Sequence, residues 1–433
     1  MPITVIEGEQ RGDEGKGRFV DMLMPDFDIG ARFNGGDNAG HTVVAPDGEV
    51  YKLHGLPTSI VHEHATSVIG NGTAVNPLRL TGEIETLREQ GISISADNFL
   101  LSGGAHLTLP HYILQDEQRE QGKDAQGSTK SGIAQVYGAK AERRGVRAEI
   151  INNDPDKLFE IVLGGLQAQS HLMGRVSGRD QRINIETAKE YVDRAKLLGT
   201  YVTDTVLYVN QELSKDKPAR VLAEGAQAFL LDIDHGMYPY VTSSTTTVGG
   251  VLTGLGVSHK HVKRVIGVSK AIQSHVGGGP FVTEIHDPYE LQELHGDMSA
   301  VDAECGTTTG RVRRLGHLDL PQIRRSQKIN GTDEMALTKL DWVSRYSDEI
   351  PVCTTYERKG KVLDIAPDAA YKLDQSTPQY AHLPNWTEDI QHIRRFEDLP
   401  QNAQHFIKFI EQVTNVRVSM IGVGPRRDQV IVR

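Results

Sequence analysis

The chain has 433 residues, of which 38% are hydrophobic and 24% are charged, and its 44 glycines favour loops that approach ligands closely. A chain of this length can bury a large core and could form two or three domains. The net charge of −10 and the pI near 5.9 leave no overall basic surface, so a nucleic-acid partner is not expected.

Short runs of β-branched and aliphatic residues alternate along the chain with segments of helical periodicity. We predict strands over residues 3–6, 67–69, 220–223, 262–268, 335–340 and 417–421, and helices over residues 78–90, 155–169, 185–213, 321–328 and 402–414. This alternation predicts an α/β fold with a mainly parallel central sheet and helices on both faces. No repeat or linker divides the sequence, so we expect one domain over residues 1–433, with the polar segment 347–398 as a smaller peripheral excursion.

The cysteines and the apolar runs indicate the compartment. Cys305 and Cys353 lie far apart, which does not suggest a disulfide framework or a structural zinc site. The N-terminus resembles a short strand instead of a signal peptide, and no apolar stretch reaches transmembrane length. We therefore expect a cytoplasmic protein with no membrane partner.

A glycine-rich loop, GEQRGDEGKG at residues 8–17, follows the first predicted strand, so the expected fold is similar to that of P-loop NTPases. Gly17 nevertheless stands where a Walker A loop has the Ser or Thr that binds magnesium. Asp13 and Glu14 place negative charge inside this loop. Either one of these carboxylates binds a metal ion or removes a proton, or the loop is an acidic turn that caps a helix.

The segment RFNGGDNAGHTV follows at residues 32–43. Together with the loop, it resembles the adenylosuccinate synthetase family, whose N-terminal signatures are GDEGKG and GGxNAGHT. The likeness continues in the same order at residues 224–227, 231–236, 238–244, 277–281, 306–314, 337–341 and 422–425. In this family the 6-oxygen of IMP attacks the γ-phosphate of GTP. The amine of L-aspartate then displaces phosphate from the 6-phosphoryl intermediate, in the first committed step of AMP synthesis from IMP.

The resemblance implies a role for each catalytic residue. Asp13 would remove the N1 proton of IMP and coordinate Mg²⁺, with the Gly40 carbonyl completing the protein's contacts to the metal. His41 would be the general acid for the β-phosphate of the leaving GDP, and Lys16 would neutralise phosphate charge. Gln227 would contact the purine oxygen and disperse its developing charge.

The resemblance also implies a set of residues for each substrate. Asp341 would select guanine by accepting its two N–H groups. The residues for GTP would be Gly12, Glu14, Gly15, Lys16, Gly17, Gly40, His41, Thr42, Lys339, Asp341, Gly422 and Gly424. Those for IMP would be Asp13, Asn38, Thr129, Arg143, Gln227, Thr242 and Arg311, with Arg143 reaching the phosphate across a homodimer interface. Those for aspartate would be Thr307, Thr308, Thr309, Arg311 and Arg313.

Some of these residues also have a simpler interpretation. Arg143 belongs to a basic pair at a helix end, and an Asp that follows a strand, such as Asp341, is a common helix cap. The segment 307–313 could be a solvated basic surface. A lone His such as His41 is more often structural, and only its place in the sequence NAGH favours catalysis.

The sequence departs from the family pattern at several positions. Arg11 stands where Trp is frequent, and Gly422 where a serine often contacts guanine. In the phosphate-binding segment 127–134 the basic residue has moved to Lys130, and Val312 interrupts the usual arginine run. A phage branch of the family uses dGMP in place of IMP, and the intact Asp13 favours IMP.

Two other functions compete with a ligase. A GTPase switch protein would share a phosphate loop and a guanine-specific Asp, but it usually carries a Ser or Thr after the loop lysine and has no need for the segment 307–313. A dinucleotide-binding oxidoreductase would need the G-x-G-x-x-G register, which residues 12–17 lack.

Overall fold

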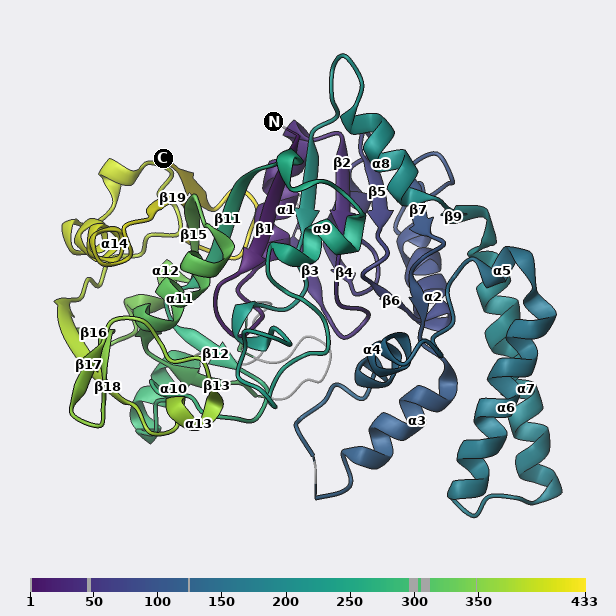
Figure 1. The fold of residues 1–433 in the computed structure, drawn as a ribbon. Coiled ribbons are helices and arrows are strands. Elements are labelled where there is room, and N and C mark those ends of the chain that lie inside the picture. The colour runs from purple at the N-terminus through teal and green to yellow at the C-terminus, as the bar shows by residue number, and fades with distance from the viewer. Residues whose placement is uncertain (1, 45–47, 124, 296–302, 305–311, 348) are drawn as a thin grey trace.

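A computed structural model describes residues 2–44, 48–123, 125–295, 303–304, 312–347 and 349–433. A ten-stranded sheet runs through the centre of the molecule (Figure 1). All neighbouring strands pair in parallel except β19 and β20, which are antiparallel. In spatial order the strands are β20 (Val430–Val432), β19 (Arg417–Gly422), β15 (Glu334–Thr338), β11 (Val262–Lys270), β1 (Ile3–Gly8), β10 (Val221–Glu224), β2 (Ile29–Arg32), β5 (Thr66–Ile69), β7 (Phe99–Ser102) and β9 (Val202–Thr203).

Both faces of this sheet are buried, because alternate side chains of each strand point to opposite faces and both sets are apolar. Ile3 and Val5 pack in a cluster with residues of α8 (Thr205–Leu213) and α9 (Gly249–Leu255). Ile6 packs on the other face, in a cluster with residues of α1 (Lys16–Leu23). The predicted α/β fold with a mainly parallel sheet is therefore confirmed.

Helices beyond β7 form one flank of the molecule, around a large apolar cluster. Asn76 begins the first of them by accepting hydrogen bonds from the backbone N–H groups of Leu78 and Arg79. These helices are α2 (Pro77–Glu89), α3 (Pro110–Arg119), α4 (Ile133–Ala141), α5 (Ile150–Asn153), α6 (Pro155–Leu172) and α7 (Gly178–Leu197). In Figure 1, α6 and α7 extend side by side away from the sheet.

The opposite flank carries a second, smaller sheet, to which the polar segment 347–398 contributes three strands. Its strands are β14 (Leu318–Asp319), β16 (Glu349–Arg358), β17 (Lys361–Leu363) and β18 (Thr377–Pro384). The helices of this flank are α10 (Pro288–His295), α11 (Leu320–Asn330), α12 (Leu340–Val343), α13 (Ala370–Leu373) and α14 (Gln401–Thr414).

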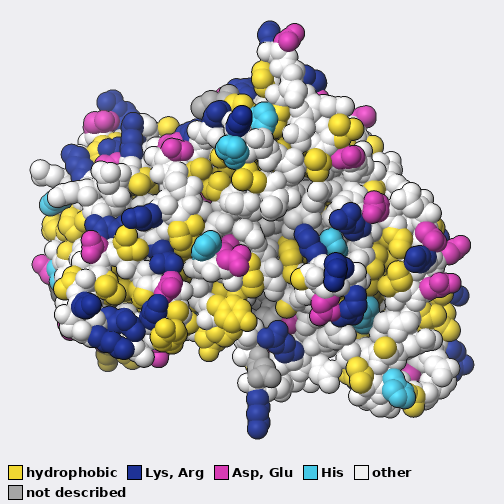
Figure 2. All heavy atoms as spheres, viewed as in Figure 1, with side chains coloured by type: hydrophobic (Ala, Val, Ile, Leu, Met, Phe, Trp, Pro, Cys, Tyr) yellow, Lys and Arg dark blue, Asp and Glu magenta, His cyan; other side chains and the backbone are white. Residues whose placement is uncertain are grey.

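Two-stranded pairs and single turns of 3₁₀ helix complete the described structure. The pairs are β3 (His41–Val44) with β4 (Val50–Leu53), β6 (Ala74–Val75) with β8 (His106–Leu107), and β12 (Gln273–His275) with β13 (Arg314–Gly316). The turns are η1 (Met24–Asp26), η2 (Thr58–Val61), η3 (Gly199–Tyr201), η4 (Phe229–Leu231), η5 (His259–His261) and η6 (Phe396–Asp398). Acidic and basic side chains are interspersed over the face shown in Figure 2.

Two of the predicted elements are wrong in extent. The helix expected over residues 185–213 is two helices, because α7 ends at Leu197, a 3₁₀ turn begins at Gly199, and the Asp204 side chain caps α8 by accepting from Leu207 N. The strand expected over residues 335–340 ends at Thr338, since Lys339 takes a left-handed conformation and α12 follows. Among the residues that the structure describes, no helix is long and apolar enough to cross a membrane.

Candidate active site

A cavity of about 1000 Å³ lies at the carboxyl ends of the central strands, where parallel sheets usually bind their ligands. Most of the predicted site residues line it: Gly12, Asp13, Glu14, Gly15, Lys16, Gly17, Asn38, Gly40, His41, Thr42, Thr129, Gln227, Thr242, Arg313, Lys339, Asp341 and Gly424. Arg143 and Gly422 are not among the lining residues. Thr307, Thr308, Thr309 and Arg311 lie outside the described residues, so the structure neither places them in the cavity nor removes them from it.

The glycine-rich loop forms the floor of the cavity. It turns between β1 and α1 through left-handed conformations at Gly12, Asp13 and Gly15, which have φ of 93°, 60° and 86°. The buried Glu14 carboxylate accepts hydrogen bonds from Gly12 N at 2.7 Å and from Lys16 Nζ at 2.8 Å. Glu14 therefore organises the loop from within, and Asp13 is the loop carboxylate that remains at the cavity surface, with a side chain 32% exposed.

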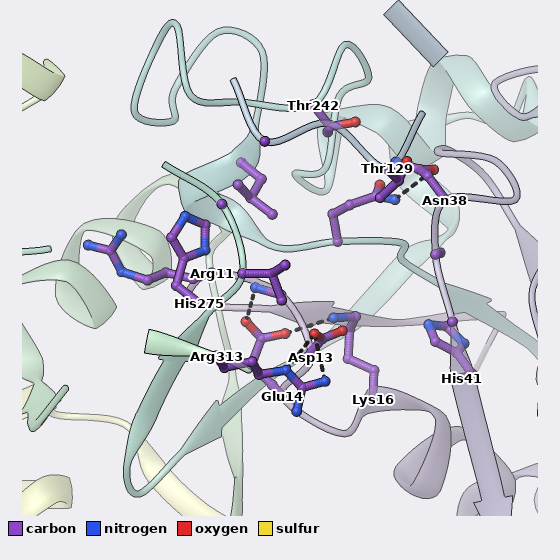
Figure 3. A pocket seen from close by; sticks show the side chains of 18 of the residues that line it. Arg11, Asp13, Glu14, Lys16, Asn38, His41, Thr129, Thr242, His275 and Arg313 are labelled. Carbon is purple, nitrogen blue, oxygen red and sulfur yellow. Dashed lines mark hydrogen bonds and ion pairs between the residues drawn. The ribbon is translucent and has the colours of Figure 1, made fainter. Parts of the chain in front are cut away.

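Asp13 and Arg313 form an ion pair in the cavity (Figure 3). Arg313 Nε and Nη2 lie 3.0 and 2.8 Å from Asp13 Oδ2. The same guanidinium donates through Nη1 to Glu304 Oε2 at 2.9 Å. Asp13 and Glu304 raise the pKa of Arg313 above its usual value, although burial alone would lower it.

His41 is held by Glu224, the last residue of β10. Nδ1 of His41 lies against Glu224 Oε1, and the carboxylate also accepts from Thr58 N at 2.8 Å and from Thr58 Oγ1 at 2.7 Å. Burial would raise the pKa of Glu224, but His41, Arg32 and Thr58 together lower it to about 2. The carboxylate is therefore ionised at neutral pH and fixes both the position and the tautomer of the imidazole.

A neutral polar group lies across the cavity from the Asp13–Arg313 pair. Asn38, Thr129 and Thr242 all line the cavity and lie in the upper part of Figure 3, and Asn38 Oδ1 accepts from Gln227 Nε2 at 3.1 Å. Hydroxyl and amide groups of this kind can donate to a phosphate without adding a carboxylate that would repel it. Lys130, next in sequence to Thr129, is exposed and is not a lining residue.

Another wall of the cavity is formed by residues that follow β15 and β19 in the chain, among them Lys339, Asp341 and Gly424. Lys339 Nζ lies 3.4 Å from the centre of the Trp342 ring, and Asp341 Oδ2 accepts from Gln391 Nε2 at 3.3 Å. Arg18 crosses from α1 and donates to the Gly424 carbonyl. A Cβ at position 422 would overlap the Arg18 guanidinium, so any larger residue there would require the end of the Arg18 side chain to move.

Arg11, the other departure beside the loop, is buried in the cavity wall. Its guanidinium lies 4.1 Å from the centre of the Phe281 ring, and burial lowers its pKa to about 10. The flat guanidinium thus stacks on an aromatic ring, a packing role that the frequent Trp could also fill.

Glu224, Lys270 and Glu304 support the site through charged contacts and were not among the predicted residues. Glu224 directly follows the predicted strand 220–223, and Lys270 lies two residues beyond the predicted strand 262–268; closeness to a strand end is the one signal that could have identified them. Glu304 has no such signal in the sequence.

The residues that could hold a metal ion are few. Among the described residues, no three His, Cys, Asp or Glu side chains gather in a metal-binding arrangement. Asp13 and Gly40 both line the cavity. One carboxylate with one carbonyl suits Mg²⁺, which keeps several waters and usually takes its remaining ligands from substrate phosphates.

Comparisons with known proteins agree on one family. The family model described as adenylosuccinate synthetase matches residues 5–431. Adenylosuccinate synthetases of Exiguobacterium sibiricum and Streptomyces coelicolor are each 41% identical to the chain, covering 100% of it and 98% and 99% of their own lengths. A fully ligated adenylosuccinate synthetase structure from Plasmodium falciparum is 35% identical, with full coverage of both chains and a TM-score of 0.89.

A more distant structure shares the fold. The succinoaminodeoxyadenylate synthetase of cyanophage S-2L, bound to dGMP and dATP, has a TM-score of 0.63 at 18% identity, and it covers 100% of this chain and 95% of its own.

Proposed function

Because the chain belongs to the adenylosuccinate synthetase family, we propose that the cavity at the carboxyl ends of the central strands is its active site. The activity is that of a GTP-dependent carbon–nitrogen ligase, which converts GTP, IMP and L-aspartate into GDP, phosphate and adenylosuccinate. The observation that carries the proposal for the site is the meeting of Asp13, Lys16, His41 and Asp341, from three separate segments, around one cavity.

Asp13 is the proposed base. Glu14 is engaged within the loop, so Asp13 is the carboxylate placed to accept the N1 proton of IMP. Loss of this proton makes the 6-oxygen nucleophilic toward the γ-phosphate of GTP, and a positioned base typically contributes about 10²–10⁴ in rate. Phosphorylation turns a poor leaving group into a good one, which the aspartate amine then displaces. Gln227 is proposed to donate to the purine oxygen.

His41 and Lys16 are proposed to stabilise the leaving GDP. The Glu224 carboxylate lies against Nδ1 of His41 and would stabilise the imidazolium, so that Nε2 can donate to the β-phosphate. Lys16 shares its charge between Glu14 and the phosphates. Mg²⁺, held by Asp13 and the Gly40 carbonyl, would neutralise phosphate charge.

The remaining cavity walls are proposed to select the two nucleotides. Asp341 would accept the N–H groups of guanine, with Lys339 along the base and Gly424 on its other side. For IMP, the group of Asn38, Thr129 and Thr242 would bind the phosphate.

Arg143 is proposed to complete the IMP site from the second subunit of a homodimer. It is exposed and lies at the end of α4 in a left-handed conformation, outside the cavity of its own chain. A guanidinium presented in this way could bind a phosphate bidentately in the partner's cavity.

For L-aspartate, Arg313 is the described residue that we propose to bind a substrate carboxylate. Thr307, Thr308, Thr309 and Arg311 belong to the same proposal and lie outside the described residues. A cytoplasmic location is also proposed, because IMP and GTP are metabolites of that compartment.

The experiment that tests the proposal is an assay of phosphate release and product with GTP, Mg²⁺, L-aspartate and either IMP or dGMP. We expect turnover to require IMP and aspartate together and to form adenylosuccinate. Turnover with dGMP but not with IMP would show the substrate preference of the phage enzyme, which resembles this chain only in its fold. Nucleotide hydrolysis without IMP and aspartate would contradict the ligase site.

A further inference from the structure

The Arg313 guanidinium contacts two carboxylates, Glu304 on one edge and Asp13 on the other. Its Nη1 donates to Glu304 at 2.9 Å. Its Nε and Nη2 share Asp13 Oδ2 at 3.0 and 2.8 Å (Figure 3). The two contacts differ in their surroundings, because the side chain of Glu304 is 3% exposed and that of Asp13 is 32% exposed. Glu304 is thus a buried anchor for Arg313, whereas Asp13 lies on the cavity surface.

Glu304 also contacts two lysines that come from other elements. Lys270, the last residue of β11, places Nζ 2.9 and 2.8 Å from the two Glu304 oxygens. Lys339, which follows β15, places Nζ 3.6 Å from Oε1. Three cations therefore surround one buried carboxylate, and each of the four charges would be costly to bury without the others.

The position of Lys270 is itself fixed by the phosphate loop. The Gln10 side chain accepts from Lys270 N at 2.9 Å and donates to Lys270 O at 3.0 Å. Burial lowers the pKa of Lys270 to about 8, with Arg313 and Lys339 adding to the lowering, so Glu304 is needed to keep the lysine protonated beside its cationic neighbours. Burial would raise the pKa of Glu304, but the three cations hold it well below its usual range.

We infer that Glu304 is a positioning residue that builds the aspartate site and the guanine site on one shared carboxylate. It holds Arg313 by one edge and leaves the other edge facing the cavity, and it holds Lys339 beside Asp341. This inference rests on the proposed roles of Arg313 and Lys339.

The same geometry connects aspartate binding to the base. A guanidinium held at one edge presents its other edge to a carboxylate. In the structure, Asp13 occupies that edge. A carboxylate of L-aspartate that binds there takes the place of Asp13, which is then released for its role toward IMP. Without Glu304, Arg313 would be free to follow Asp13, and the exchange would lose its anchor.

The test is Glu304→Gln, which keeps the shape of the side chain and removes its charge. We expect the KM for L-aspartate and the KM for GTP to rise about tenfold or more, as for a lost hydrogen bond to a charged group, while the KM for IMP changes by less than about twofold. Glu304→Asp keeps the charge but shortens the reach, so it should restore part of both losses. Glu284→Gln is the matched control, because Glu284 pairs with the neighbouring Arg314 and does not line the cavity.

Two results would overturn the inference. One is that Glu304→Gln raises the KM values for L-aspartate, GTP and IMP equally, or raises none of them. The other is the same pattern in Glu284→Gln. If Glu304→Gln does not fold, Glu304→Asp must show the aspartate and GTP effects alone. If the parent protein makes no product, the proposed function fails separately. Calorimetric binding of GDP and L-aspartate to the parent and to Glu304→Gln then decides the inference, and unchanged affinities would refute it.

Discussion

Replacing Glu224 by glutamine should disable His41 without altering any group that contacts substrate. The pKa of Glu224, which burial alone would raise, is lowered from 4.5 to about 2, chiefly by His41. This difference corresponds to about 3 kcal/mol in favour of the ionised carboxylate. Because this interaction would also stabilise the protonated His41 that donates to GDP, we expect kcat to fall by a factor of about 10²–10³.

The assay is steady-state phosphate release at saturating GTP, IMP and L-aspartate, with the KM for GTP measured alongside. Glu224 does not line the cavity, so the KM values should stay near those of the parent. Thr58→Val is the matched control, since it removes one hydrogen bond to Glu224 and leaves the carboxylate beside His41. A kcat of Glu224→Gln within about fivefold of the parent would refute the reasoning. Equal losses in both variants would show that Glu224 acts through the packing of η2 instead of through His41.

Four further predictions follow from the site and its surroundings. Asp13→Asn should lower kcat by about 10² or more with IMP binding retained. If the variant kept most of its activity, Asp13 would not be the base. Asp341→Asn should raise the KM for GTP by about tenfold and shift the base preference, whereas unchanged selectivity would show that another group reads the base. Arg143→Leu should raise the KM for IMP, and mixing it with the Asp13→Asn protein should partly restore activity in hybrid dimers; no rescue would place Arg143 in its own subunit's site. Glu9→Gln should flatten the pH dependence of stability. Burial raises the pKa of Glu9 to about 7 from 4.5, so the folded protein keeps a proton that the unfolded chain releases between these values. The free energy of unfolding therefore falls by up to about 3 kcal/mol as pH rises from the unfolded pKa of 4.5 through the folded pKa of about 7. Denaturant unfolding at pH 5 and pH 8 checks this, and a variant with the parent's pH dependence would contradict it.

Local sequence patterns predicted the elements of the core well, because they depend on short-range periodicity. The apolar runs that became β1, β5, β10, β11 and β19 were identified within a few residues, as were the helices α2, α6, α11 and α14. The failures occurred where a local signal was overridden. The pattern over residues 185–213 kept helical periodicity across Gly199, where the chain in fact turns and inserts β9.

The candidate site could also be assembled from the sequence, but only through motifs of fixed spacing. Glycine positions and the residues between them specify a loop that can surround phosphates, since its backbone conformation is set locally. Glu304 could not be found in this way. Its three partners are the last residue of β11, the residue before β13 and the residue after β15, and their meeting depends on the order of strands in space.

The sequence by itself therefore determined the fold class, the family and the candidate residues, because these depend on periodicity and on motifs that are local in the chain. The tertiary structure decided what each charged residue pairs with. It showed that Glu14 supports the loop while Asp13 reaches the cavity, and that Glu224 holds His41. It also showed that Arg18 fills the space beside Gly422. The physical reason is that such pairings join side chains from distant segments, and they form only where the parallel sheet brings the ends of its strands to one edge.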